Sequence, residues 1–335
     1  PLRTITPPDD PTGWASSPID RLIAEARRTH DVHPVGPADR RALIRRATFD
    51  LIGLPPAPDR VEAFAADDRP DAFQRLIDEL LASPQYGERW GRDWLDLARY
   101  ADTAGDNSDY PIREAYLYRD YVIDAFNADL PYDEFLHEQL AGDVLAADGP
   151  AEDYARRVIA TGFLAQAKRF GTRKLEDTHQ IIEDVLNTTG QVVLGLSLRC
   201  ARCHDHKFDP ITARDYYALY GFFAGARFPF AGAEEDHRPS EFAPLVPPDQ
   251  LKEYEARHAE AVAELQARVD EAAKPESKES GSRRQGQLKR LNDELKRLKD
   301  EGPAALAPRA YAVREGQPTD VKLQIGGDPR KLGEL

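Results

Sequence analysis

The sequence of 335 residues contains no methionine and only two cysteines. It also has no uninterrupted apolar run of about eighteen residues, the length that a membrane-spanning helix needs, so we expect no transmembrane segment in this chain. The formal net charge of −14 argues against a nucleic-acid partner, because the phosphates would be repelled. Since the chain starts at Pro1 without any methionine, we expect it to be a segment of a longer or processed protein.

Both cysteines fall in one short string, Cys200-Ala201-Arg202-Cys203-His204, which has the form C-x-x-C-H. This pattern is typical of covalent haem attachment, in which each thiol adds across a vinyl group of the macrocycle. The imidazole of His204 then lies beside the iron and can take one axial position. The string predicts one covalently bound haem c, held by Cys200 and Cys203, with His204 as iron ligand.

Three other interpretations of the same residues remain open. Cys200, Cys203 and either His204 or His206 could bind zinc, although no further cysteine supplies a second ligand pair. The two thiols could also form a redox-active pair, although a thioredoxin-like pair lies in a βαβ context that is absent nearby. They could finally form a small structural disulfide or remain inert.

The second axial ligand of such a haem is not fixed by the motif. The absence of methionine excludes His/Met ligation within this chain. His206 follows His204 after a single residue, too short a link to pass round the macrocycle to its other face. His179 lies about 37 Å from the motif along a straight helix, so it reaches the iron only if the chain turns back at the glycines that follow it. We keep His179 and His137 as candidate distal ligands, beside an open or water-bound position.

Apolar residues at helical spacing predict a mainly α fold, a multi-helix haem-binding domain followed by a helical hairpin and a short β segment. Ser17-Pro18-Ile19-Asp20 combines an N-cap, a proline at the first helical position and an acid in the first turn. The expected organisation is an extended lead-in at 1–16, a helical cytochrome c-type domain at 17–230, a linker at 231–248, an antiparallel coiled-coil-like hairpin at 249–302 and a β-hairpin at 303–335 that starts a truncated further domain.

Aromatic residues recur on two of the expected helices. Trp94, Tyr100, Tyr118 and Tyr121 lie upstream of the motif, and a dense aromatic helix, ARDYYALYGFF, follows it. Such side chains pack in a core or form the walls of a flat macrocycle, and the spacing alone does not separate these roles.

Several separated strings resemble a known family, the large exported planctomycete proteins built around cytochrome-associated domains of unknown function. The resemblance extends over about residues 17–230, and 310–334 look like the junction to a second conserved domain. The strings are RRATFDLIGLPPAP (45–58), ERWGRDWLDLARYAD (88–102), YRDYVIDAFNADLPYDEFLHEQLAGD (118–143) and CARCHDHKFDPITARDYYALYGFF (200–223).

The resemblance implies haem on Cys200 and Cys203 with His204 as axial ligand, and export to the periplasm or cell surface of a planctomycete-like bacterium. It implies no established reaction, although the family's association with polysaccharide breakdown makes carbohydrate a candidate substrate.

Three classes of function follow from these observations. The first is an electron-transfer cytochrome that serves a redox partner protein or a neighbouring cytochrome domain. The second is a haem-dependent oxidoreductase that acts on carbohydrate or another exported substrate. The third is a non-haem structural or binding module with a cysteine pair or zinc. The motif specifies the cofactor far better than the reaction.

Overall fold

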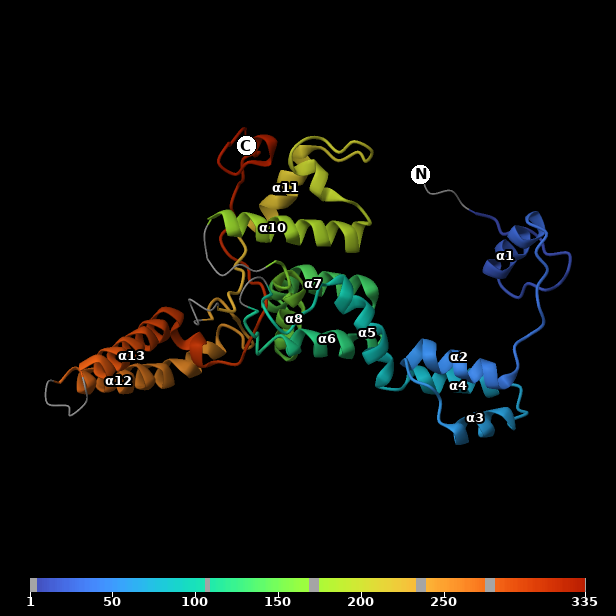
Figure 1. Ribbon diagram of the computed structural model, residues 1–335, viewed down its shortest axis with the longest axis horizontal. Helices are drawn as coiled ribbons and strands as arrows, with labels where there is room; N and C mark the ends of the chain where they lie inside the picture. Colours follow the sequence, from blue (N-terminus) through green and yellow to red (C-terminus); the bar gives the residue numbers. More distant parts are fainter. Residues whose placement is uncertain (1–4, 106–108, 169–174, 233–238, 275–280, 335) are drawn as a thin grey trace. The chain divides into compact units, whose positions relative to one another are not determined.

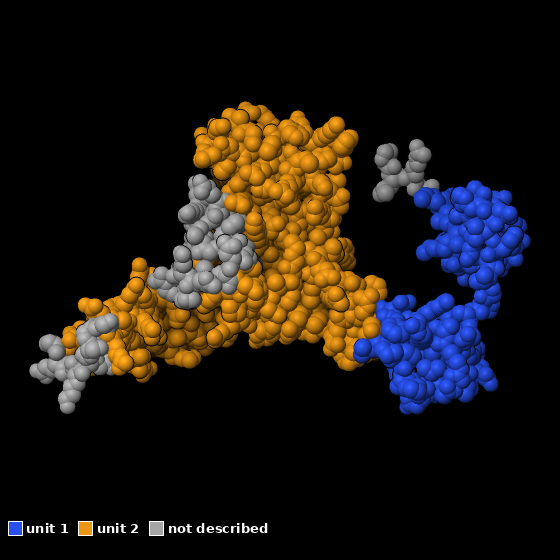
Figure 2. Space-filling view, viewed as in Figure 1, with its two compact units in different colours: residues 1–50, 54–79 blue, residues 51–53, 80–335 orange. Residues whose placement is uncertain are grey.

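A computed structural model describes residues 5–105, 109–168, 175–232, 239–274 and 281–334. The protein is mainly helical, as the sequence predicts (Figure 1). The chain divides into two compact units, residues 1–50 with 54–79 and residues 51–53 with 80–335 (Figure 2). The expected single domain at 17–230 is therefore divided near residue 80. The buried apolar residues of the first unit lie on its later helices, such as Ile44, Phe64 and Leu76, and this separate burial is a long-range outcome that helical periodicity does not encode.

The described residues of the first unit form four helices, and the first of them begins where the sequence predicts it. Ser17 caps the first helix as predicted: its side chain accepts from the Asp20 backbone N–H, and the Asp20 carboxylate accepts from the Ser17 N–H. This helix has no buried residue, and Ile19 is exposed. The helices are α1 (Pro18–Thr29), α2 (Arg40–Ile52), α3 (Pro58–Ala65) and α4 (Ala72–Leu81).

The second unit is built around a buried aromatic cluster. The Trp94 indole N–H donates to the Tyr118 hydroxyl at 3.0 Å, and that hydroxyl donates to Gln139 Oε1 at 2.7 Å. Phe135 packs edge-on against Trp94. The helices that surround this cluster are α5 (Gln85–Leu97), α6 (Tyr116–Asn127), α7 (Tyr132–Ala147), α8 (Tyr154–Ala160) and α9 (Gly162–Ala165), with the 3₁₀ turn η1 (Ala151–Asp153). Trp94 and Tyr118 are therefore core residues.

A second helical layer carries the motif. Helix α10 (Leu175–Thr189) passes into a π turn, η2 (Gly190–Leu194), and Gly195 then adopts a left-handed φ of 66°. The glycines that follow His179 are Gly190 and Gly195, and the helix ends and the chain turns at these residues. The motif follows in the 3₁₀ helix η3 (Leu198–Arg202), and both α10 and α11 (Ala213–Ala224) pack against it.

The predicted helical hairpin is confirmed. After η4 (Gln250–Lys252), α12 (Glu253–Ala273) and α13 (Gly281–Glu301) lie side by side in Figure 1, with Leu265, Val269, Leu291, Leu295 and Leu298 buried between them. His258 Nε2 lies 2.6 Å from the Leu298 carbonyl oxygen, and Arg284 donates to the Ala272 carbonyl. The start of α12 therefore contacts the end of α13, and the end of α12 contacts the start of α13. The two helices are antiparallel.

The predicted β-hairpin at 303–335 is wrong in its pairing. After η5 (Gly302–Leu306), strand β2 (Arg309–Ala310) pairs antiparallel with β1 (Ala243–Pro244), which lies in the expected linker. The reason is burial: Ala243, Ala310 and Ala312 form an apolar cluster with Ala146 and Val158 of the helical layer. Packing against helices α7 and α8 therefore outweighs pairing within residues 303–335. The chain then runs to η6 (Ile325–Gly327).

Candidate functional site

The C-x-x-C-H motif lies on a short helical turn whose apolar residues are buried against helix α11. Leu198 and Ala201 are buried in an apolar cluster with Tyr216 and Tyr217 of α11. Cys200, Cys203 and His204 are exposed, and both cysteines are free thiols. The turn therefore fixes its backbone through two apolar residues while it presents all three predicted haem-binding side chains to solvent.

Arg202, inside the motif, connects this turn to three other segments. Its Nη1 donates to Glu183 Oε2 of α10 at 2.6 Å, and its Nη2 donates to the Gly327 carbonyl at 2.7 Å. The Tyr217 hydroxyl donates to the Arg202 carbonyl at 3.0 Å. Sequence reasoning gave Arg202 and Gly327 no role, because their partners lie far away along the chain.

The imidazole of His204 contacts a backbone carbonyl through one of its two ring nitrogens. Its Nδ1 lies 2.7 Å from the Asp205 carbonyl oxygen, which only accepts hydrogen bonds, so Nδ1 carries the proton. In the neutral ring, Nε2 then offers its lone pair, and no described residue binds it. The Asp205 carboxylate in turn accepts from the Ala213 N–H at the start of α11. This is the arrangement in which a metal-binding histidine is oriented through its second nitrogen.

His206 stabilises the loop that follows the motif. Its Nδ1 accepts the backbone N–H of Asp209 at 2.8 Å, and its side chain is largely buried. Phe208, between these residues, is 84% exposed, and the Lys207 ammonium lies 5.2 Å from the centre of its ring. An exposed phenyl ring beside the motif is apolar surface that a bound macrocycle would cover. Sequence reasoning missed Phe208, whose only local signal is its place four residues after His204.

The two candidate distal ligands have different environments. His137 is exposed on α7, which packs against α8 and α9, whereas α10 and α11 pack against the motif. His179 is buried on α10, with Nδ1 3.3 Å from the Tyr220 hydroxyl oxygen, and its Nε2 has no partner among the described residues. Burial, and then the positive charge of Arg202, lower the pKa of His179, so its ring is neutral at neutral pH. The structure places His179, but not His137, in the layer that anchors the motif.

The aromatic residues of α11 lie behind the motif. Tyr216, Tyr217 and Tyr220 are buried, and burial raises the pKa of the Tyr217 and Tyr220 hydroxyls to about 12 in each case. Phe222 is exposed and lines an open groove of about 670 Å³ between α11 and residues 315–323. Tyr217 is shared by this groove and by the anchor of the motif.

The other interpretations of the cysteines gain no support from this geometry. The thiols of Cys200 and Cys203 are not joined in a disulfide. Within the described ranges, no three or more His, Cys, Asp or Glu side chains form a group that could hold a metal ion. A preformed zinc centre of the kind that Cys200, Cys203 and His204 or His206 would build is thus not seen in that part of the chain.

In the described ranges, each helix is too short or too polar to span a lipid bilayer.

The chain belongs to the PSCyt2 family of proteins of unknown function (DUF1549). The family model matches residues 18–228. No match is found among curated proteins or among solved structures. The matched range contains both helical layers and the motif, and it ends before β1 and the helical hairpin.

Proposed function

We propose that the protein carries one haem c on Cys200 and Cys203 and transfers electrons. The observation that carries this proposal is the orientation of the His204 ring, whose Nδ1 lies 2.7 Å from a backbone carbonyl oxygen, so that Nε2 is available to bind iron. Two exposed thiols on one short turn lie immediately before it. When bound, the haem would supply a one-electron couple between ferric and ferrous iron.

The residues of the chain would hold the group as follows. Each thiol adds its sulfur to one carbon of a haem vinyl group and its hydrogen to the other, so that a thioether forms and nothing leaves. Leu198 and Ala201 fix the turn in the apolar cluster, and Phe208 supplies exposed apolar surface beside it. His204 Nε2 is the proposed proximal donor. Exposed attachment residues would place part of the haem at the surface, which suits exchange with a redox partner protein or a neighbouring cytochrome domain.

His179 is the protein donor that we propose for the second axial position. Its buried Nε2 lacks a partner among the described residues, and an unpaired buried nitrogen is unfavourable unless something binds it. The neutral ring is also the form that binds metals. We assign no such role to His137, since it is exposed on a helix that packs elsewhere.

A second candidate function rests on the groove beside α11. Aromatic rings and carboxylates line it, among them Tyr217, Phe222, Asp320 and Glu334, and such side chains bind sugar hydroxyl groups and ring faces. A haem-dependent oxidoreductase acting on carbohydrate would use this groove. It requires an open iron position, whereas the electron-transfer function with His179 does not.

Electron paramagnetic resonance of the ferric protein, made in a host with cytochrome c maturation, separates these functions. The electron-transfer proposal expects a low-spin bis-histidine signal that turns high-spin in His179→Ala and is altered in His204→Ala. His137→Ala is the matched control and should leave the signal unchanged. A high-spin resting state that neither His179→Ala nor His137→Ala alters would favour the oxidoreductase.

The compartment follows from the same chemistry. Haem c is attached to apoprotein after export, so we propose a periplasmic or cell-surface location for the native protein. Fractionation of the native host tests this proposal, and a haem-loaded protein confined to the cytoplasm would contradict it.

A further inference from the structure

The segment around Gly327 folds back onto the motif from far along the chain. The Gly327 carbonyl accepts from Arg202 Nε at 3.2 Å and from Nη2 at 2.7 Å. Glu183 holds the remaining nitrogen of the same guanidinium. Arg202 is therefore fixed between α10 and a segment that lies outside the matched residues 18–228.

Gly327 also lies directly against the second thiol. Its φ of +75° is a conformation that side chains rarely adopt, and a Cβ atom at this position would lie 2.6 Å from Cys203 Sγ. The same Cβ would lie 3.0 Å from Arg202 Nε. No side chain fits here unless the thiol or the guanidinium moves. Gly326, with a φ of +63°, differs in one respect: a Cβ there would meet nothing within 4 Å.

We propose that Gly327 is a positioning residue for Cys203. Its bare Cα sets the direction in which the sulfur lies, and its carbonyl holds the arginine that precedes the cysteine. The two thiols of the motif are then inequivalent, because Cys203 depends on the segment around residue 327. In the haem-loaded protein, where the inference rests on the proposed function, glycine at this position is required for the second thioether.

The haem-free protein provides the direct test. Wild type, Gly327→Ala and Gly326→Ala are treated with iodoacetamide, and mass spectrometry follows the alkylation of each cysteine over time. Cys200 serves as the internal reference. Because access controls thiol reactivity, we expect Gly327→Ala to lower the Cys203-to-Cys200 rate ratio at least about threefold, as the added methyl group covers the sulfur. Gly326→Ala brings the same backbone strain without the contact and should keep the wild-type ratio.

A ratio that is unchanged or increased in Gly327→Ala, or one that falls equally in Gly326→Ala, overturns the proposal. If Gly327→Ala fails to give the wild-type circular dichroism spectrum, Arg202→Lys replaces it. Lysine keeps the positive charge opposite Glu183 but cannot donate two hydrogen bonds to the Gly327 carbonyl. The segment around Gly327 is then held less firmly against Cys203, so the Cys203-to-Cys200 rate ratio should rise. An unchanged ratio in that variant also overturns the proposal.

The haem-loaded protein gives a second reading. Gly327→Ala should attach haem through Cys200 alone, so that one vinyl group remains and the pyridine haemochrome band moves to longer wavelength. Failure of the haem proposal would appear as no attachment in any variant, including wild type. That outcome leaves the alkylation ratios intact, so the two proposals fail separately.

Discussion

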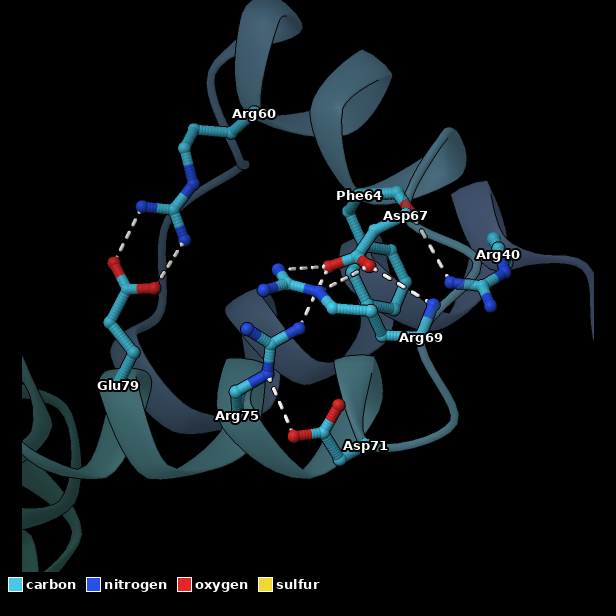
Figure 3. A network of polar contacts seen from close by, with 8 residues as sticks. All are labelled: Arg40, Arg60, Phe64, Asp67, Arg69, Asp71, Arg75 and Glu79. Carbon is cyan, nitrogen blue, oxygen red and sulfur yellow. Dashed lines mark hydrogen bonds and ion pairs between the residues drawn. The ribbon is translucent and has the colours of Figure 1, made fainter.

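The N-terminal unit and the layer around the motif use charged residues in different ways. In the first, Arg60 binds Glu79 through two hydrogen bonds of 2.6 and 2.9 Å, with both side chains about half exposed (Figure 3). In the second, the Glu183 side chain is only 9% exposed and Arg202 25%. Exposed pairs exchange water for each other at little net gain, whereas a buried pair cannot lose one partner cheaply. The degree of burial therefore distinguishes the surface pair Arg60–Glu79 from the pair Arg202–Glu183, which anchors the motif.

The carboxyl groups of the two compact units also differ, as Asp67 of the first unit and Asp143 of the second show. Asp67 lies between Arg69 and Arg75, and the hydrogen bond with Arg69 is the largest of the effects that lower its pKa (Figure 3). Asp143 on α7 accepts the backbone N–H of Glu315, and burial raises its pKa above the ordinary value. Acid should therefore weaken the interaction of Asp67 with its arginines, whereas it removes the cost of burying a charged carboxylate at Asp143.

The largest expected effect comes from removing one charge of each pair. Glu183→Gln leaves the Arg202 guanidinium without its carboxylate, and we expect a loss of about 2 kcal/mol in the free energy of unfolding. The matched variant Glu79→Gln should change it by no more than about 0.5 kcal/mol. Urea unfolding followed by circular dichroism measures both, and hydrogen exchange assigns each loss to its unit. Equal losses would remove the distinction between anchor and surface network.

The pH dependence of stability should have opposite sign for Asp143 of the second unit and Asp67 of the first unit. The pKa of Asp143 is raised above 3.8 in the folded protein, so its contribution to stability is complete below that pH and is lost as the pH rises through the folded pKa. The pKa of Asp67 is lowered, so its contribution is present above 3.8 and lost as the pH falls through the folded pKa.

Thermal unfolding at several pH values, with Asp143→Asn and Asp67→Asn as paired variants, measures this difference. The stability of wild type relative to Asp143→Asn should fall as the pH rises from about 3.5 to 7, because only the wild-type residue ionises. Relative to Asp67→Asn it should rise as the pH increases from about 2 to 4 and then stay level, because the Asp67 contribution is complete above 3.8. Parallel slopes for the two variants would contradict the assignment of opposite pKa shifts to the arginine contacts of Asp67 and the burial of Asp143.

The smallest effect comes from a position where neither charge nor burial acts. Gly286 lies exposed inside α13, and a Cβ there would meet nothing within 4 Å. We expect Gly286→Ala to stabilise the helical hairpin by about 0.5–1 kcal/mol, because alanine loses less backbone entropy in a helix. Urea unfolding of the hairpin helices tests this, and a destabilised variant would indicate an unrecognised contact.

Features that depend on neighbours in sequence could be predicted. The cap at Ser17, the turn at Gly195 and the apolar seam of the hairpin each arise within a few residues, and the structure contains all three. The division near residue 80 and the pairing of Ala243 with Ala310 could not be predicted. Both result from burial against elements that are distant in sequence, which no local periodicity records.

The candidate site also combines features that neighbouring residues determine with features that only distant contacts determine. Cys200, Cys203 and His204 are adjacent in the chain, so the motif is visible without any structure. The exposure of His137 and the burial of His179 depend on which face of a helix meets the core. The contact of Gly327 with Cys203 joins residues more than a hundred positions apart, and only the folded chain reveals it.

Covalent attachment of haem tests the central claim most directly. Protein made with cytochrome c maturation is extracted with acid acetone, assayed as the pyridine haemochrome and digested for mass spectrometry. The account predicts that the pigment stays with the protein and that the peptide containing Cys200 and Cys203 carries one haem mass through two thioethers. Pigment that washes away, or an unmodified peptide with two free thiols, would contradict it.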